Sequence, residues 1–514
     1  MTDGRGPGAS PPRVADDVRR DIQGFITTGY GHLTVAAYLF VRFANPPAAR
    51  RWIGGIVDTV ATAAPWPRDS AGVTIKPDST VNIAFTAEGL RACGLPADVL
   101  CTFPIEFQEG IATPARSKIL GDTEESAPAA WELGGPGTDP VHAIVIIHAR
   151  DDVALDALCA SELLAIDLTK GGVVAHAGAV QRGYRPGTGT EPFGFRDGVA
   201  QPAIAGLDDE GLPTGEFILG YTNHYDVIPP SPAVRAALDP SHILPSLDNP
   251  YHGSERRRDL GRHGSFVVYR KLQQDVAGFW RALRDESVRQ RGAADAGYMI
   301  WLASKMVGRW PSGAPLVDAP ERDQASLGDR DAFEFGADPD GRACPIGAHI
   351  RRTNPRDDLK PYPAEQSRHM AAAHRLLRRA RVFGPPLFDA DVLTAGAPGD
   401  RDAILSIADD GLPRGIHFFS INASIRSQFE FVQQTWCNNP SFGGLSANKD
   451  PIVGDHARVG DTPTRMAIPI ADGMLRTAPL PRFVTVRGGA YLFMPSITAL
   501  RFLSAGSFAP GSTV

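Results

Sequence analysis

One histidine with several arginines close behind it is the first feature of this sequence that could do chemistry. His349 lies in a proline-bounded segment, residues 344–357, and is followed by Arg351, Arg352 and Arg356. The prolines and an asparagine predict irregular backbone rather than the middle of a regular element. An imidazole held there could ligate a metal beside an anionic cofactor, which the arginines would neutralise. A solvated histidine on a surface loop is the alternative, and the segment alone does not exclude it.

An aspartate between two glycines is the second candidate. Asp197 lies between Gly194 and Gly198 in the otherwise apolar segment 193–202. Glycines let a backbone approach a ligand closely, and a carboxylate placed there could move protons. An isolated aspartate of this kind is more commonly a turn residue that bonds its own backbone.

Several common sites are missing from the sequence. It contains no GxSxG elbow, no P-loop and no Rossmann glycine fingerprint in a suitable context. His369 and His374 are five positions apart, so they would not share a helix face as a zinc pair does. The five cysteines include no CxxC pair, which argues against a disulfide framework or a zinc ribbon and fits a reducing compartment.

The elements that must position these residues are short strands and helices. We predict strands at 21–27, 81–85, 143–148, 264–270, 416–421 and 483–486, and helices at 32–43, 87–93, 151–164, 274–285 and 367–381. Their order resembles the split βαβ pattern, and the second half opens with the same strand–helix pair as the first. The prediction is an α+β fold with two ferredoxin-like domains, antiparallel sheets and peripheral helices, as in the dimeric α+β barrel superfamily.

Length and composition set the organisation of the chain. Because 514 residues exceed one ordinary core, we predict a mobile tail at 1–15, an N-terminal domain at 16–228, a connecting region at 229–262 and a C-terminal domain at 263–514. A net charge of −6 argues against a surface that coats nucleic acid. The N-terminus lacks the apolar core of a secretory signal, and no stretch approaches the roughly 20 apolar residues of a membrane span. We therefore expect a cytoplasmic protein without a nucleic-acid or membrane partner.

Several segments together resemble the dye-decolorizing peroxidases, a family of haem peroxidases. Gly194-Phe195-Arg196-Asp197-Gly198 with Gln201-Pro202 looks like the family's GxxDG signature, and residues 348–356 resemble its proximal-histidine segment. Residues 305–311, 428–436 and 486–491 also resemble family segments, in the family's order. The resemblance runs from about residue 20 to the end, and the length resembles the larger, fungal-like members.

That resemblance implies a role for each reactive residue. His349 would be the axial ligand of haem iron, and Asp197 the distal acid/base. Arg378 would be the distal arginine, because it precedes Phe383-Gly384 as the family's arginine precedes an aromatic–glycine pair. Arg375 and Arg379 lie close enough in sequence to remain alternatives.

The resemblance also implies the surroundings of the haem. Glu430 would accept a hydrogen bond from the far side of the His349 ring, and Gly198 would lie in the cofactor-binding turn. Arg351, Asn354 and Arg356 would hold the haem propionates, with a solvated cationic loop as the alternative.

The expected activity is that of a haem peroxidase. One haem b per chain would react with hydrogen peroxide to a ferryl state, which would oxidise dyes, phenols or similar organic reductants. Trp310, Trp436 and Tyr491 are conceivable electron relays, although buried aromatic residues are usually core. A porphyrin decarboxylase of related fold and a non-enzymatic haem carrier are the alternatives. The oligomeric state stays open.

Overall fold

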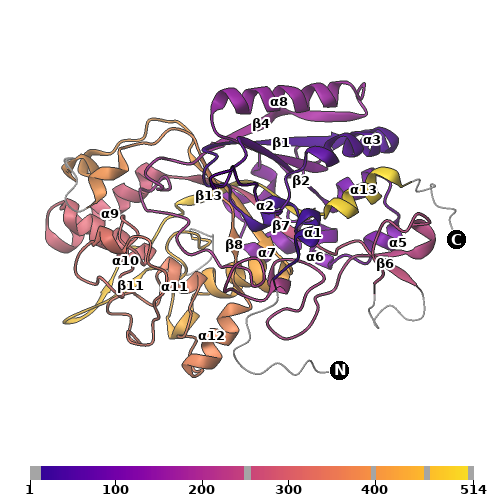
Figure 1. The fold of residues 1–514 in the computed structure, drawn as a ribbon. Coiled ribbons are helices and arrows are strands. Elements are labelled where there is room, and N and C mark those ends of the chain that lie inside the picture. The colour runs from indigo at the N-terminus through magenta and orange to yellow at the C-terminus, as the bar shows by residue number, and fades with distance from the viewer. Residues whose placement is uncertain (1–12, 248–255, 395–400, 457–462, 507–514) are drawn as a thin grey trace.

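Eight of the nine strands in the main sheet form a closed ring. The computed structural model describes residues 13–247, 256–394, 401–456 and 463–506 (Figure 1). The strand order is β7-β13-β2-β3-β1-β4-β9-β10-β8, and a further β7–β10 pairing joins the two ends into a barrel. The strands are β1 Val35–Phe43, β2 Ser79–Phe85, β3 Ala143–Ala149, β4 Val173–Tyr184, β7 Ser265–Gln274, β8 Leu377–Arg378, β9 Arg381–Phe383, β10 Gly415–Asn422 and β13 Val484–Met494.

Each half of the chain contributes one ferredoxin-like sheet. The N-terminal strands follow the order β4-β1-β3-β2, and the C-terminal strands follow the equivalent order β13-β7-β10-β9. Among the described residues, the strand pairings within the ring are antiparallel. This confirms the predicted α+β class with two ferredoxin-like sheets. The two sheets meet at β13–β2 and β4–β9, and the domain boundaries predicted from sequence stay a prediction.

Helices cover the outside of the barrel. In Figure 1, α8 (Asp152–Asp167), α3 (Pro46–Ile56) and α13 (Ile497–Ala505) lie along the N-terminal strands, and α9 (Val276–Arg291) and α10 (Ala296–Val307) lie on the opposite side of the molecule. Smaller elements of the same covering are α1 Asp16–Asp21, α2 Gly24–Thr27, α4 Ala87–Ala92, α5 Ala97–Leu100, α6 Ile105–Glu109, α7 Pro114–Leu120, α11 His349–Thr353, α12 Ala364–Ala372, and the two-stranded pairs β5 Ala233–Arg235 with β6 Arg257–Asp259 and β11 Ala467–Ile470 with β12 Gly473–Arg476.

Successive side chains of each strand point alternately into the barrel and to its outside. Tyr38, Ile146 and Tyr269 belong to one buried cluster inside the barrel, and Leu39, Val145 and Val268, each one position away, belong to another on the outside. On β7, the outward Arg270 and Leu272 line a cavity. The C-terminal strands are therefore a wall with a closed core behind it and a cavity in front.

Most of the predicted elements are confirmed, including the helix after residue 86. Thr86 caps α4 by accepting a hydrogen bond from the Gly89 N–H. Two predictions near the N-terminus are wrong: residues 21–27 include the end of α1 and the whole of α2, and the helix predicted at 32–43 is largely β1. Since β1 is buried on both faces, its apolar residues run without alternation, and such a run does not distinguish a strand from a helix.

The arginine-rich segment was also predicted wrongly as one helix. Helix α12 ends at Ala372, and residues 377–383 form β8 and β9. The arginines from 375 onward are therefore not the last turn of a helix. The irregular backbone predicted around residue 349 is also wrong in part, because α11 begins there.

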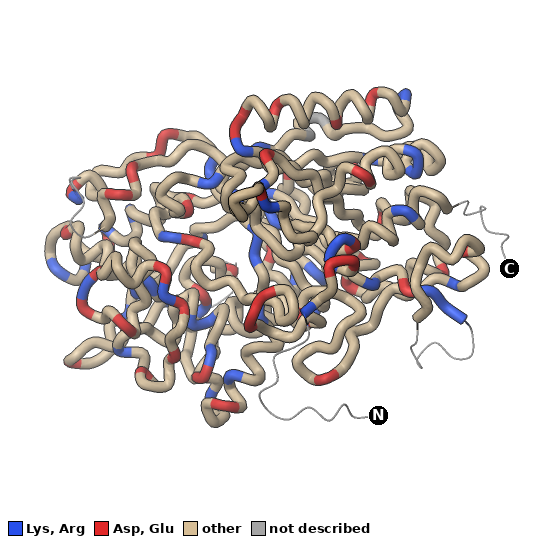
Figure 2. Tube along the Cα trace, viewed as in Figure 1, with Lys and Arg blue, Asp and Glu red and all other residues tan. Residues whose placement is uncertain are grey.

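Three further predictions concern the surface and the ends of the chain. Most of the predicted tail, residues 1–12, lies outside the described residues. Within the part of the chain that the structure describes, no helix has the length and apolar character to cross a membrane. Along the described part of the chain, Lys and Arg are interspersed with Asp and Glu (Figure 2).

Candidate active site

A cavity in front of the C-terminal strands brings together residues that are distant in sequence. Its walls include Asp197, His349 and Arg378, together with apolar side chains of β7, β10 and β13 such as Leu272, Ile416, Phe418, Val484 and Val486. The cavity has a volume of about 290 Å³. The barrel therefore presents an apolar wall to the space in which the predicted reactive residues meet.

Asp197 and Arg378 form an ion pair at the edge of this cavity. Arg378 Nη1 lies 3.1 Å from Asp197 Oδ1, and both side chains are about one-third exposed. The same carboxylate oxygen accepts the Gly198 N–H at 2.6 Å, where a φ of +81° gives Gly198 a backbone conformation that suits glycine. The Gln201 side chain accepts the Arg378 backbone N–H at 2.9 Å. The glycine-flanked turn thus supplies the carboxylate and also anchors the strand that carries its arginine.

The neighbouring arginines point in different directions. Arg379 Nε and Nη2 donate to the backbone carbonyls of Phe25 and Ile26, so this side chain is turned towards the N-terminal segment. Arg375 lines the cavity, where burial, together with the charges of Arg356 and Arg378, lowers the pKa of its guanidinium to about 10. Among the three arginines considered from sequence, Arg378 is the one paired with Asp197.

His349 begins helix α11 and is held from behind by an aspartate. His349 Nδ1 lies 2.9 Å from Asp450 Oδ2, and the Asp450 side chain is fully buried. Burial alone would raise the pKa of this carboxyl, but the charge of His349, its hydrogen bond and the Val453 N–H outweigh burial and hold the pKa at about 2. An ionised Asp450 fixes the tautomer, since Nδ1 must donate to it. Nε2 is then the ring nitrogen left for a ligand in the cavity.

Glu430 does not have the role predicted from sequence. Its carboxylate accepts Arg116 Nη1 at 2.9 Å and the Tyr491 hydroxyl at 2.8 Å. The acid behind His349 is Asp450, 101 positions further along the chain. Sequence reasoning missed it because no motif or spacing links an aspartate in the irregular segment around Pro451 to a histidine so far away.

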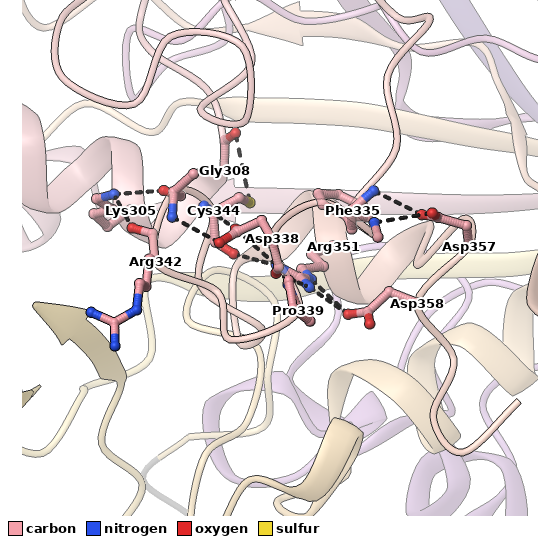
Figure 3. A network of polar contacts seen from close by, with 12 residues as sticks. Lys305, Gly308, Phe335, Asp338, Pro339, Arg342, Cys344, Arg351, Asp357 and Asp358 are labelled. Carbon is pink, nitrogen blue, oxygen red and sulfur yellow. Dashed lines mark hydrogen bonds and ion pairs between the residues drawn. The ribbon is translucent and has the colours of Figure 1, made fainter. Parts of the chain in front are cut away.

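Arg351 is also not available to a bound anion. Its five N–H groups donate to the carboxylates of Asp338 and Asp358 and to the backbone carbonyls of Asp338 and Cys344 (Figure 3). The guanidinium lies 4.6 Å from the centre of the Phe335 ring, and only 1% of the residue is exposed. Arg351 instead ties α11 to the segment before it, so the predicted contact with a propionate is wrong.

Asn354 and Arg356 do line the cavity, as does Arg309, which sequence reasoning did not select. Arg356 uses Nη1 and Nη2 on Asp331 and the Phe333 carbonyl, and its guanidinium lies 3.9 Å from the centre of the Phe333 ring. The buried Nδ2 of Asn354 has no hydrogen-bond partner among the described residues. Buried polar groups are normally paired, so this amide indicates a hydrogen-bond acceptor in the cavity.

Together the walls fit a haem. They provide one imidazole, several apolar side chains and three arginines, Arg309, Arg356 and Arg375. These side chains suit a planar, largely apolar ligand that carries carboxylates. No cluster of three or more histidine, cysteine, aspartate or glutamate side chains that could hold a metal ion by itself is present in the described ranges.

Comparisons with known proteins agree with this arrangement. No family model matches the chain. The dye-decolorizing peroxidase of Mycena epipterygia is 29% identical over 468 residues, which are 84% of this chain and 77% of the relative. The multifunctional dye peroxidase DyP2 of an Amycolatopsis species is 29% identical over 484 residues, 90% of this chain and 91% of the relative.

Solved structures extend the similarity to the whole fold. A decolorizing peroxidase from Auricularia auricula-judae matches 95% of this chain and 100% of its own length, with a TM-score of 0.70 and 26% identity. A dye-decolorizing peroxidase in complex with 2,6-dimethoxyphenol matches with a TM-score of 0.71 and 25% identity, over 95% of this chain and 99% of its own. Over most of its length the chain is similar to dye-decolorizing peroxidases. It is a peroxidase of this type, an oxidoreductase that depends on haem.

Proposed function

We propose that this dye-decolorizing peroxidase holds one haem b per chain on His349 and reduces hydrogen peroxide at the Asp197–Arg378 pair. The observation that carries the proposal is that one cavity contains both an imidazole backed by an ionised carboxylate and a separate carboxylate–guanidinium pair. A haem carrier would need only the imidazole with its carboxylate partner and the anion-binding arginines. The separate carboxylate–guanidinium pair is the feature that favours catalysis.

The cofactor would be held by residues of the cavity wall. His349 Nε2 is the nitrogen offered to iron, and Arg356, Arg375 and the Asn354 amide are placed to bind carboxylates. Haem, when bound, supplies the iron at which the peroxide O–O bond is cleaved. Asp450 keeps the imidazole oriented and makes it a stronger base.

Asp197 would move the proton that this cleavage requires. Its ionised carboxylate accepts a proton from one peroxide oxygen and returns it to the other, which leaves as water. The adjacent Arg378 guanidinium favours the ionised carboxylate and stabilises negative charge on the leaving oxygen. The Gln201 anchor keeps that guanidinium at the edge of the cavity.

Organic compounds would then return the electrons. The similar enzyme solved with 2,6-dimethoxyphenol supports phenols as one class of reductant, and the names of the relatives support dyes. We propose both classes for this chain, with hydrogen peroxide as the oxidant.

The test follows the reaction with peroxide in the haem-loaded protein by rapid-mixing absorption spectroscopy. Replacing a positioned proton-transfer group typically slows its step by about 10²–10⁴-fold, and we expect Asp197→Asn and Arg378→Leu to slow haem oxidation within this range. Arg150→Leu is the matched control, because Arg150 forms an exposed ion pair with Asp78 and does not line the cavity. Unchanged rates in both active-site variants would refute the assignment of the pair.

A further inference from the structure

The interior of the barrel contains a hydrogen-bonded tyrosine and histidine that the proposed reaction does not use. Tyr269 on β7 and His417 on β10 are 0% and 1% exposed. The Tyr269 hydroxyl lies 3.0 Å from His417 Nδ1, and the two rings are nearly parallel, with centroids 6.1 Å apart and an interplanar angle of 16°. The pair is therefore well ordered and sealed from solvent.

The protonation of this pair follows from its contacts. His417 also hydrogen-bonds the backbone carbonyl of Arg182, and a ring nitrogen must be protonated to donate to a carbonyl. Because Nδ1 faces Tyr269, Nε2 carries that proton and the Nδ1 lone pair accepts the phenolic O–H. Burial, and next the charge of Lys271, lower the pKa of His417 to about 3, while burial raises the pKa of Tyr269. At neutral pH the structure thus holds a neutral phenol against a neutral base.

This pair lies directly behind the wall of the active-site cavity. Ile416 and Phe418, the neighbours of His417 on β10, face the cavity, as does Arg270, the neighbour of Tyr269 on β7. Successive side chains of a strand point to opposite faces. Only the thickness of the strands therefore separates Tyr269 and His417 from the space assigned to haem.

Aromatic rings surround the pair on the interior side. The Tyr38 ring is 4.9 Å from that of His417, and the Phe419 ring is 4.9 Å from those of both Tyr38 and Tyr269. Closely packed rings of low polarity shield a radical from water and from reaction with solvent. Filling of the core would explain the rings, but filling alone does not require a buried phenol aimed at an imidazole lone pair.

We propose that Tyr269 and His417 are an internal redox site that stores one of the two oxidising equivalents delivered by peroxide. This inference rests on the proposed function of the cavity. When no organic reductant is available, Tyr269 gives one electron to the oxidised haem and its phenolic proton passes to His417 Nδ1. The products are a neutral tyrosyl radical and an imidazolium, and an electron from a later reductant, with return of the proton, restores the phenol.

The histidine is essential to this step because the phenol is buried. An oxidised phenol is a strong acid, and inside the barrel it can release its proton only to a group already hydrogen-bonded to it. His417 Nδ1 is that group, at 3.0 Å. Removal of the base should therefore abolish the radical even though the tyrosine remains.

The experiment treats haem-loaded protein with one equivalent of hydrogen peroxide in the absence of reductant. Absorption spectroscopy follows the haem, and freeze-quench electron paramagnetic resonance follows organic radicals. Ring-deuterated tyrosine in the wild-type protein should narrow the radical spectrum, which identifies a tyrosine without any substitution. We expect loss of this signal in Tyr269→Phe and its retention in Tyr38→Phe, the matched control from the same interior.

A second variant tests the base. His417→Gln keeps a hydrogen-bond acceptor but offers no basic nitrogen, so the tyrosyl signal should be lost while the haem is oxidised at the wild-type rate. A signal that persists in Tyr269→Phe, or a spectrum unaffected by deuterated tyrosine while the haem is oxidised normally, overturns the inference and leaves the proposed function intact. Failure of the wild-type haem to react with peroxide overturns both.

Discussion

At the scale of single residues, the hydrogen-bond partner decides which of two buried acids acts on His349. Asp450 and Glu430 are both almost fully buried. Asp450 bonds His349, whereas Glu430 bonds Arg116 and Tyr491. Only the negative charge of Asp450 can therefore influence a metal through the His349 imidazole.

We predict that Asp450→Asn raises the iron reduction potential and weakens haem binding by on the order of 10–100-fold, as removal of a partner behind a metal ligand typically does. Spectroelectrochemical titration and haem transfer to a competing protein measure the two effects. Glu430→Gln is the matched control, and its potential should stay at the wild-type value. A larger shift in the Glu430 variant would restore the role that sequence resemblance gave to Glu430.

Glu191 provides a prediction about pH. This carboxyl lines the cavity and accepts the N–H groups of Phe193 and Phe195 and the Gln274 side chain. Burial, together with the charge of Asp197, raises the pKa of Glu191 to about 7 in spite of these bonds. The folded state thus binds more protons than the unfolded state between pH of about 4.5 and 7, and the contribution of Glu191 to stability falls as the pH rises through this window.

The corresponding variant is Glu191→Gln in the haem-free protein. Relative to this variant, the wild type should lose stability as the pH rises from about 4 to about 8, a range that brackets the window set by linkage, as measured by urea unfolding. Glu365→Gln, on the exposed side of α12, should follow the wild type. Parallel curves for wild type and Glu191→Gln would contradict the raised pKa.

Sequence reasoning succeeded best for residues inside compact motifs. Asp197 and His349 lie in short, specific segments, and the structure places both in the cavity. Arg351 was misassigned because its sequence neighbourhood does not reveal Asp338 and Asp358, which occupy its guanidinium. Partners of buried charges depend on tertiary contacts, which spacing along one segment cannot predict.

At the scale of elements, helix α11 is held in place by one buried arginine. Arg352 donates to the backbone carbonyls of Gly347, Trp436, Asn439 and Asn448. These bonds tie the helix that begins with His349 to the segment that leads into Asp450. The geometry of His349 and Asp450 therefore depends on a side chain that does not line the cavity.

We predict that Arg352→Met lowers the free energy of unfolding, by about 1–3 kcal/mol for each buried carbonyl that finds no new partner. The haem absorption spectrum should also change, because Asp450 loses its fixed position. Arg368→Ala is the control, since Arg368 forms an exposed pair with Glu334 and should leave stability and spectrum nearly unchanged. Equal stability of the two variants in chemical denaturation would show that Arg352 is not the anchor.

Elements were predictable where local signals agreed. The strand at 81–85 alternates, and Thr86 after it provides a cap, so β2 and α4 could be predicted together. The segment 367–381 carries helix-forming residues throughout, yet pairing with β10 converts its end into β8 and β9. The partner strand β10 lies about 40 positions later in the sequence, and no residue pattern within 367–381 indicates the pairing.

At the scale of the whole molecule, the two halves share one barrel. The interior cluster draws on Tyr38 and Ile146 from the first half and on Tyr269, Phe419 and Leu492 from the second. The ferredoxin-like order of each half could be predicted, but closure depends on the short contacts β13–β2 and β4–β9. Contacts of so few residues carry no recognisable sequence pattern.

We predict that residues 13–247 and 256–506, produced separately, do not unfold cooperatively, because each would expose half of the shared interior. Calorimetry and near-ultraviolet circular dichroism would detect the missing tertiary structure. Co-expression of the two segments should restore a single transition. A sharp transition in isolated 13–247 would instead establish an independent N-terminal domain.

The alternation along β7 and β10 has a consequence for how this enzyme can evolve or be engineered. Leu272, Ile416 and Phe418 can be randomised in a library to reshape the reactive side of the wall, since none of them points into the barrel. Insertion of a single residue in either strand would exchange the two sides, and the interior tyrosine and histidine would then face the cavity. Selection can therefore explore new chemistry here by substitution, while changes of length are confined to the loops.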